Sequence, residues 1–447
     1  AQTKVYATNL VSSSHTTNVG NSVDGNEGTR SIIESHAGYL LGIGSYDGHI
    51  ELAFPTMVPA NQTFYLRINT EDNILDALLG GTLGDILSGV VGGLAGGSQN
   101  FTIQVNNNNT EVMSLYSGFA ANFSGDQGKI VSDIDGNFYL AITPPQAYNR
   151  VRITNNLNSL LGLGNVKTME VWDAYYVSAP DMCNEPKFTS YDVTGLNLDL
   201  LQLSNVSANN ERAIDGDMNT KSTLSFGVLA IGATVIQRAH FESPSIVGEE
   251  FGIRFGSSTN FLSLNLFTNL RVKAMKGTQV VYNEVLNNVI PQNVRDSLAN
   301  NGVTTFYFTP NASVDKITFE YSAVLGLNVA QSVDIYEFIK RPASPILDVN
   351  ASNLTICQGT AATVQATTSI PNATIYYYES ATSTTPLASA PSGQSATFGA
   401  FFNTTLIYAA SGFPGCSYQS RRLPIEVTVI EGPSNTELSV PNLLPIY

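Results

Sequence analysis

A ten-residue phrase occurs twice in this chain, about 190 residues apart. The first copy is SVDGNEGTRS at Ser22–Ser31, and the second is AIDGDMNTKS at Ala213–Ser222. The match continues downstream, where LGIGSYDGHIELAF from Leu41 parallels LAIGATVIQRAHFE from Leu229. Self-similarity in the same order over this length predicts two copies of one domain rather than a single large enzyme.

The repeats and the prolines divide the 447 residues into four parts. Residues 1–178 form the first copy and residues 184–340 the second. Residues 346–432 differ from the repeats and contain short alternating or β-branched runs separated by turn residues, as in a β-sandwich. Residues 433–447 form a tail rich in Pro, Asn and Ser that ends in apolar residues.

Alternation of apolar and polar residues predicts the fold class. Phe64, Leu66 and Ile68 alternate with polar or amphipathic residues in the first copy, and Ile317 and Phe319 do so in the second. One apolar face per strand is typical of antiparallel sheets that pack face to face. We therefore predict an all-β protein with two tandem antiparallel β-sandwich domains followed by a third sandwich.

Composition restricts the environment and the partners. Charged residues make up 13% of the chain, against roughly 25% in ordinary soluble proteins. Asn, Ser, Thr and Gly fill the polar positions, as is typical of secreted β-modules, and a start at Ala1 without Met fits signal cleavage. A net charge of −15 argues against nucleic acid as a partner.

The stretch from Ile74 to Gly97 is apolar, and from Ile74 to Leu94 its apolar residues fall at roughly helical spacing. It carries Asp76, Asp85 and eight glycines. Charges and glycines make a lipid-spanning helix unfavourable. We predict a protein that does not span the membrane.

The phrase A-x-D-G-D-x-x-T, followed by a closing strand such as MEVW or VDIY, resembles the discoidin or galactose-binding-like fold. The resemblance implies that this turn holds a structural Ca²⁺ and that loops at one end bind glycans or lipid. By position, the implied Ca²⁺ ligands are Asp215 and Thr220, with Asp217 as a further ligand. Asp24 and Thr29 correspond to them in the first copy.

The chain departs from that family at two places. Ser31 and Ser222 stand where the family usually has Trp, and the closing-strand Glu aligns with Thr168 and Ser332. The alternative is that each Asp-Gly pair only forms a tight turn. The sequence leaves both interpretations open.

The ending TICQGTAATVQA…GCSYQSRRLPIEVTV is similar to Ig-like modules of large flavobacterial and other Bacteroidetes surface proteins. The resemblance implies a secreted or cell-surface adhesin exported by the type IX system. An oxidising exterior favours a Cys357–Cys416 disulfide. In an Ig-like sandwich, however, their two turns are expected at opposite ends, which opposes the bond.

Residues suited to catalysis form no recognisable motif. The four His fall in neither HExxH nor H-x-H spacing, and no G-x-S-x-G is present. His49 and Glu51 share one strand face, as do His240 and Glu242, and we interpret both pairs as structural. We predict that the chain is not an enzyme.

Two functions remain. In the first, tandem sandwiches form an adhesin that binds glycans or surfaces. Trp172, the only Trp, aligns with Tyr336 on the closing strand, which favours a role in the sheet over a sugar-binding surface.

In the second possible function, the chain is a subunit of an extracellular homo-polymer assembled through apolar loops and the tail. Glu437–Tyr447 is then expected to dock on protein, because it carries several apolar side chains.

Overall fold

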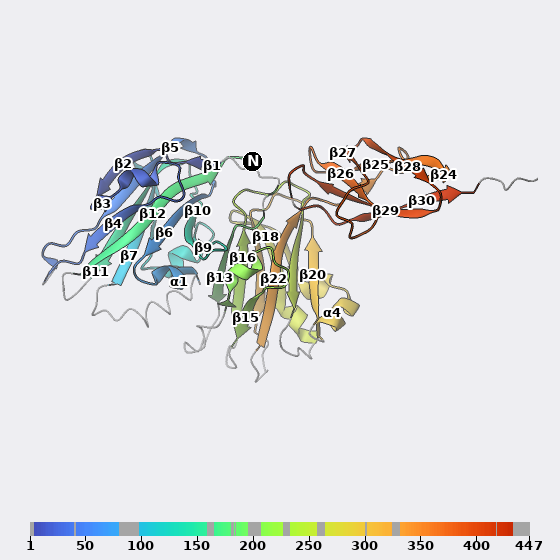
Figure 1. Cartoon of the computed structure of the whole chain (residues 1–447). Helices are drawn as coiled ribbons and strands as arrows, with labels where there is room; N and C mark the ends of the chain where they lie inside the picture. Colours follow the sequence, from blue (N-terminus) through green and yellow to red (C-terminus); the bar gives the residue numbers. More distant parts are fainter. Residues whose placement is uncertain are drawn as a thin grey trace, which may run out of the picture. The chain divides into compact units, whose positions relative to one another are not determined.

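The protein is an all-β structure, as predicted, with an Ig-like region at the C-terminal side. The computed structural model describes residues 4–39, 42–79, 98–158, 165–179, 183, 185–194, 207–226, 233–256, 264–299, 302–323, 331–416 and 418–431. Two compact units are present. One contains residues 1–247 and 251–340, and the other contains residues 248–250 and 341–447 (Figure 1).

The first repeat is built from two sheets. In spatial order the first sheet holds β3 (Thr16–Thr17), β4 (Ser31–His36), β12 (Val166–Val177), β6 (Phe64–Thr70), β10 (Phe138–Ile142) and β9 (Gly128–Ser132), with β1 (Lys4–Tyr6) beside β12. The second holds β2 (Asn9–Ser14), β5 (His49–Val58), β11 (Tyr148–Asn158), β7 (Ser98–Asn107) and β8 (Thr110–Tyr116). Neighbouring strands run antiparallel, as β12 does with β4 and β6.

The second repeat has the same strand order. One sheet holds β14 (Ser207–Ala208), β15 (Ser222–Phe226), β22 (Gln331–Arg341), β17 (Glu250–Gly256) and β20 (Val303–Phe308). The other holds β13 (Phe188–Thr194), β16 (Thr234–His240), β21 (Lys316–Ser322), β18 (Leu270–Lys276) and β19 (Gln279–Val285). The correspondence includes β4 with β15, which follow the two Asp-Gly turns, and β12 with β22, the closing strands.

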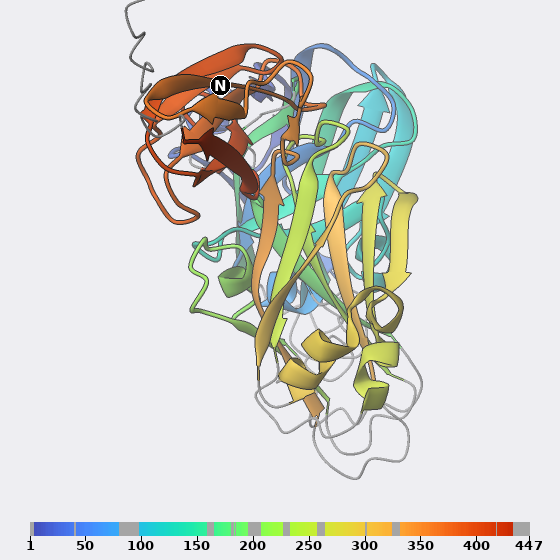
Figure 2. The ribbon, with the colours of Figure 1, turned by 90° about the vertical axis from the view of Figure 1, so that its right-hand side faces the viewer.

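The repeats differ in strand β9 of the first repeat and in two helices of the second. The second repeat has the helices α3 (Leu286–Val289) and α4 (Gln292–Ala299) between β19 and β20, at one end of its sheets (Figure 2). In the first repeat β9 adds an outer strand, and Ser132 of β9 pairs with Thr189 of β13. The pairing joins a sheet of each repeat into one 12-stranded sheet.

The alternating pattern places one apolar core in each repeat. Phe64, Leu66 and Ile68 are buried between the sheets of the first repeat, as predicted. Tyr65 points to the other face of β6, yet it is only 4% exposed because the junction with the second repeat covers it. Period-2 patterning therefore identified the core, but it gave no sign that part of the outer face is also buried.

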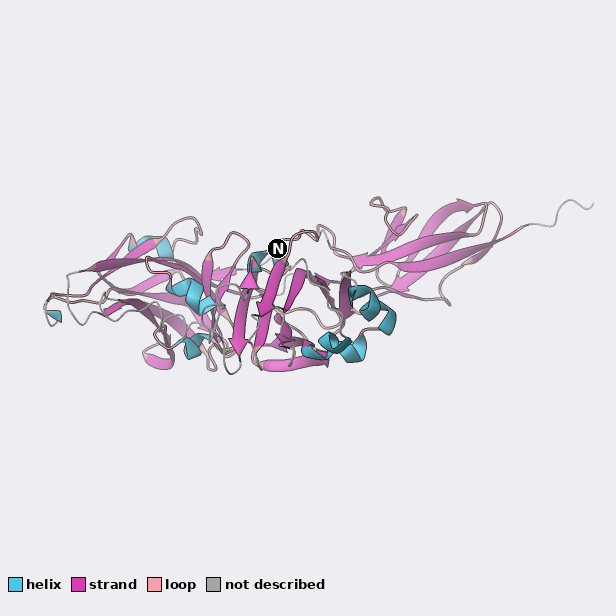
Figure 3. Ribbon diagram, turned by 90° about the horizontal axis from the view of Figure 1, so that it is seen from below, coloured by secondary structure: helices cyan, strands magenta, loops and turns pink. Residues whose placement is uncertain are grey.

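Helices are few among the described residues, where strands dominate (Figure 3). The apolar stretch after Asn73 begins with α1 (Ile74–Leu79), and residues 80–97 of that stretch lie outside the described part. Short 3₁₀ helices are η1 (Val19–Ser22), η3 (Ala120–Phe123), η5 (Asn210–Ala213) and η6 (Leu264–Asn269). Within the described ranges, no helix has the length and apolar character needed to cross a membrane.

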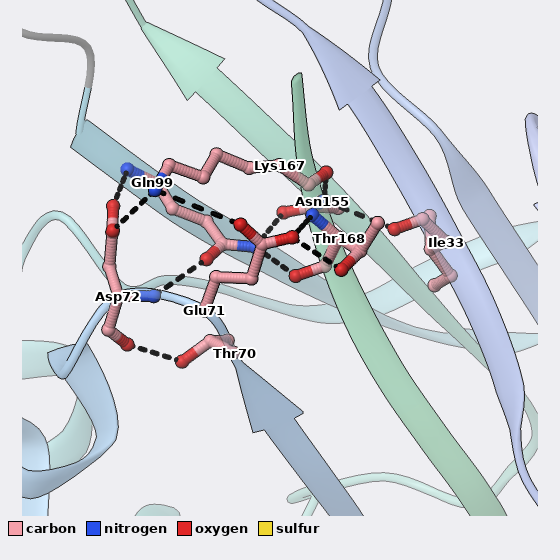
Figure 4. Close-up of polar contacts among 8 residues, drawn as sticks. All are labelled: Ile33, Thr70, Glu71, Asp72, Gln99, Asn155, Lys167 and Thr168. Atoms are coloured by element: carbon pink, nitrogen blue, oxygen red, sulfur yellow. Dashed lines mark hydrogen bonds and ion pairs between the residues drawn. The ribbon is translucent and has the colours of Figure 1, made fainter. Parts of the chain in front are cut away.

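A buried amide network ties the two sheets of the first repeat together (Figure 4). Asn155 of β11 donates its side-chain N–H groups to the carbonyls of Ile33 and Lys167, which belong to the opposite sheet. Gln99 of β7 donates to the Asn155 side chain at 2.9 Å and to the carbonyl of Thr168 at 2.8 Å. Because Asn155 and Gln99 are at most 1% exposed, these bonds form in a region of low dielectric, where they are strong.

The C-terminal unit has two sheets of its own. One holds β23 (Ile346–Leu347), β25 (Thr360–Thr367) and β28 (Ser395–Phe401), and the other holds β24 (Thr355–Cys357), β30 (Leu423–Ile430), β29 (Thr405–Gly412), β26 (Thr374–Tyr378) and β27 (Ala388–Pro391). The core between them contains Val364, Tyr377, Ile407 and Val427.

Cys357 is an exposed free cysteine, so the Cys357–Cys416 disulfide does not form. The tail, with Glu437–Tyr447, lies outside the described residues.

Candidate functional site

The two Asp-Gly phrases fold into the same turn. Each follows a 3₁₀ turn whose preceding residue, Asn18 or Asn209, adopts a left-handed backbone with φ of 54° or 55°. The glycines Gly25 and Gly216 have φ of 72° and 78°, a conformation that residues with a Cβ rarely adopt. The shared sequence phrase therefore encodes a shared backbone.

In the first repeat the turn gathers oxygen atoms around Thr29. Asp24 Oδ2 lies 2.9 Å from Thr29 Oγ1, and Asp24 Oδ1 accepts the Asn26 backbone N–H at 2.8 Å. The same hydroxyl lies 2.9 Å from the Asn26 carbonyl and 3.3 Å from the Asn21 carbonyl. One hydroxyl proton serves only one of these acceptors, so the turn holds more oxygen atoms than protons to bridge them.

The second repeat repeats this arrangement. Thr220 Oγ1 lies 2.7 Å from Asp215 Oδ2 and 3.1 Å from the Asp217 carbonyl. The Arg212 carbonyl is 3.5 Å from the same hydroxyl. The carboxylate of Asp217 accepts two N–H groups of Asn219 instead, each at 2.9 Å. The structure thus brings Asp215 and Thr220 together, whereas Asp217 approaches Thr220 through its backbone.

Each closing strand adds one carboxylate that the sequence comparison missed. Asp173 of β12 accepts the Gly25 N–H at 3.1 Å, and Glu337 of β22 accepts the Gly216 N–H at 2.9 Å. Both are at most 3% exposed. An acid follows the matched aromatic residue in both copies, after Trp172 and after Tyr336, and that signal was present in the sequence.

The expected positions Thr168 and Ser332 were therefore wrong. Strand pairing sets Val171 opposite Ser31 and Ile335 opposite Ser222, which brings the residues two places later to the turn. Thr168 instead donates both its N–H and its hydroxyl to Glu71 (Figure 4). The alignment of the short closing-strand motif placed the acid too early by five residues.

The two buried carboxylates hold protons more tightly than usual. Burial, together with the nearby carboxylates of Asp24 and Glu27, raises the pKa of Asp173 to about 6. Burial raises the pKa of Glu337 to about 9, with Asp215 among the acids that contribute. In both cases the glycine N–H acts in the opposite direction but is outweighed.

These turns have the donor set that Ca²⁺ prefers. That ion takes carboxylate, carbonyl and hydroxyl oxygens, and Asp173 Oδ2 is buried without a hydrogen-bond partner among the described residues. No group of three or more His, Cys, Asp or Glu side chains in the described ranges is placed to hold a metal. An ion at either turn would therefore depend on carbonyl and hydroxyl oxygens as well as on two carboxylates.

A stack of rings lies beside the loop between β4 and β5, and the sequence analysis did not identify it. Tyr39 and Tyr46 belong to that loop, His36 ends β4, and His15 lies between β2 and β3. The Tyr46 ring stacks on His15 at a centroid distance of 3.8 Å and on His36 at 5.6 Å. Tyr39 meets His36 edge to face at 5.5 Å and is 64% exposed. The Tyr46 hydroxyl donates to Glu34. We call His15, His36, Tyr39 and Tyr46 the ring stack.

The other aromatic candidate has a structural environment. Trp172 is 7% exposed, and the Arg67 guanidinium lies 4.2 Å from its ring centroid. Tyr336 has the corresponding contact with Arg254 at 5.8 Å. This recurrence fits the sheet role predicted for the pair.

The His and Glu pairs also have structural partners. His240 Nε2 lies 2.8 Å from Ser190 Oγ, and Glu242 accepts the Tyr175 hydroxyl at 2.6 Å. Glu51 accepts the Ser12 hydroxyl at 3.1 Å.

Fold and site define the class as a multidomain β-sandwich protein with duplicated Asp-Gly turns and an Ig-like region. Residues 342–430 match the family model described as Ig-like domain CHU_C associated. No curated protein matches the chain.

Solved structures give only distant similarity. The glycoside hydrolase domain of Endo-D from Streptococcus pneumoniae R6 aligns at 13% identity and a TM-score of 0.22, covering 68% of this chain and 40% of that one. A β-1,2-glucanase from Parabacteroides distasonis aligns at 9% identity and 0.21, covering 49% and 34%. The adhesin domain of Epf from Streptococcus pyogenes aligns at 9% and 0.21, covering 47% and 77%. The chain thus spans less than half of the first two, and TM-scores this low support no conclusion.

Proposed function

We propose that this protein is a non-catalytic extracellular adhesin that attaches to glycans through the ring stack of its first repeat. The Ig-like match at residues 342–430 supports a secreted or cell-surface location and export by the type IX system. The ring stack carries the proposal, because apolar ring faces cover the C–H bonds of a sugar while polar edges bind its hydroxyls.

Local contacts hold the ring stack in place before any ligand arrives. Tyr46 is held by stacking contacts with two imidazoles and by its bond to Glu34. His36 Nδ1 accepts the Gly38 N–H at 3.1 Å. Rings that are already ordered lose little conformational entropy on binding. Tyr39 and His15 remain exposed at the two ends of the stack, so we assign the sugar contact to them.

The test compares two exposed aromatic residues of the first repeat. Tyr39 and Phe119 are each 64% exposed, so Tyr39→Ala and Phe119→Ala remove similar exposed area. We expect Tyr39→Ala to weaken binding on a glycan array by about tenfold, with Phe119→Ala unchanged. Equal losses in both variants, or no glycan bound by the unmodified chain, would contradict the proposal.

We further propose that both Asp-Gly turns hold a structural Ca²⁺. Asp215, Thr220, Glu337 and the Asp217 carbonyl would hold it in the second repeat. The ion would neutralise the buried carboxylate and fix the turn. The orphaned Asp173 Oδ2 supports the corresponding site in the first repeat, with Asp24 and Thr29.

A second candidate is a subunit of an extracellular polymer. The pairing of β9 with β13 supports it, because sheets of this chain already join edge to edge. Among the described strands, β8 and β19 pair on one side only, and such edges accept strands from other chains. Filaments in electron micrographs of the purified chain, absent after truncation at Gly432, would favour this function over the adhesin.

A further inference from the structure

A group of basic side chains lies where the two repeats join, on the face of the 12-stranded sheet opposite the cores. Lys129 comes from β9 of the first repeat, and Arg238 and Lys316 come from β16 and β21 of the second. Arg238 pairs in register with Thr318 on one side and with Ser190 on the other. Neighbouring strands therefore present these side chains side by side.

Three buried donor groups in this cluster have no hydrogen-bond partner among the described residues. They are Lys129 Nζ, Arg238 Nη1 and Thr318 Oγ1. Lys129 is 4% exposed and Thr318 is 2% exposed. Asp192 Oδ2 is 3.9 Å from Lys129 Nζ and 3.8 Å from Arg238 Nη2, which is too far for hydrogen bonds. Native structures rarely leave buried donors unpaired, so the missing acceptor needs an explanation.

Positive charge at the junction is incompletely matched. Lys316 has Asp126 at 2.7 Å and also interacts with Asp315, whereas Lys129 and Arg238 share Asp192, which lies 3.9 and 3.8 Å away. Burial, together with the nearby charge of Arg238, lowers the pKa of Lys129 to about 7 against the opposing effect of Asp192.

The His240 imidazole lies beside the same cations, since His240 pairs in register with Lys316. Burial lowers the pKa of His240 well below its usual range, and Lys316, Arg238 and Lys129 all act in the same direction. For both groups burial is the larger cause of the lowered pKa, and the neighbouring cations add to it.

We propose that this junction binds one small inorganic oxyanion, of the sulfate or phosphate class, between the two repeats. Its oxygen atoms would accept from Lys129 Nζ, Arg238 Nη1 and Thr318 Oγ1, and its charge would offset the incompletely matched positive charge. The side chains of Arg238 and Lys316 are only 13% and 8% exposed, which limits the ligand to a small ion. Because Lys129 belongs to the other repeat, the anion ties the repeats together.

The test measures thermal unfolding of the full chain in sodium sulfate and in sodium gluconate at equal ionic strength. At about ten times its dissociation constant, sulfate is expected to raise the midpoint of the unmodified chain by about 2–3 °C. Lys129→Met removes the uncompensated ammonium, so its midpoint is expected to be higher without sulfate and unresponsive to it. Lys273→Met is the matched control, because Lys273 already pairs with Glu320, and it keeps the sulfate response.

No sulfate response in the unmodified chain, or an equal response in Lys129→Met, would overturn the proposal. An equal rise of the unfolding midpoint in sodium chloride would also overturn the proposal, because chloride has no separate oxygen atoms to accept from the three donors. If Lys129→Met does not fold, crystals of the unmodified chain soaked in selenate decide the question. An anomalous peak within hydrogen-bond distance of Lys129 Nζ supports the site, and density for water alone refutes it.

Discussion

Replacing Asn155 with alanine tests how the two sheets of the first repeat are held together. The Asn155 side chain is fully buried and makes three hydrogen bonds, to the carbonyls of Ile33 at 3.3 Å and Lys167 at 3.0 Å and from Gln99 at 2.9 Å. A buried hydrogen bond contributes about 1 kcal/mol, and an unpaired partner left behind costs more. We expect Asn155→Ala to lower the free energy of unfolding by about 3–4 kcal/mol.

Urea unfolding followed by fluorescence measures this loss where it occurs. The chain has one Trp, and Trp172 lies on β12, the strand that accepts one of the Asn155 bonds. Asn156→Ala is the control, because among the described residues the Asn156 side chain bonds with the Thr102 and Asp47 side chains, in more exposed surroundings. A loss below about 1 kcal/mol for Asn155→Ala, or equal losses in both variants, would refute the assigned role of Asn155.

Three further predictions concern calcium, pH and the turn backbone. Chelation is expected to lower the unfolding midpoint of the unmodified chain but not of the double variant Asp24→Asn/Asp215→Asn, since calcium at a hundred times its dissociation constant contributes about 2.7 kcal/mol per site; coinciding midpoints of the unmodified chain with calcium and with chelator would exclude bound ion. His240 is neutral in the folded chain because its pKa is lowered. The free energy of unfolding is therefore expected to fall by up to about 1.4 kcal/mol per pH unit below about pH 6.5, where the His240 side chain of the unfolded chain takes up a proton. Urea titrations of His240→Gln should lack this slope. Gly25→Ala is expected to lower the free energy of unfolding by about 1–2 kcal/mol through backbone strain alone, since nothing lies within 4 Å of the added Cβ. Gly20→Ala is the control, because that position is equally open and has no positive φ, and urea titration should find it nearly neutral.

The sequence by itself determined the features that depend on local patterns. Alternation of apolar residues identified the strands and the core, including Phe64, Leu66 and Ile68. The repeated phrase identified the two turns, because an Asp before a Gly in the left-handed region has few alternatives. The Ig-like region was likewise recognisable from its own residues. These are properties that residues close together in the chain decide among themselves.

Only the tertiary structure decided which distant residues meet. The register of β12 against β4 brings Asp173 to the turn in place of Thr168. The pairing of β9 with β13 buries Lys129 and its neighbours on a face that a two-layer sandwich normally exposes. Register and edge pairing are set by the summed contacts of many side chains far apart in sequence, and a slip of one residue reverses which side chains face the core. Local patterning leaves those choices open, and the folded structure makes them.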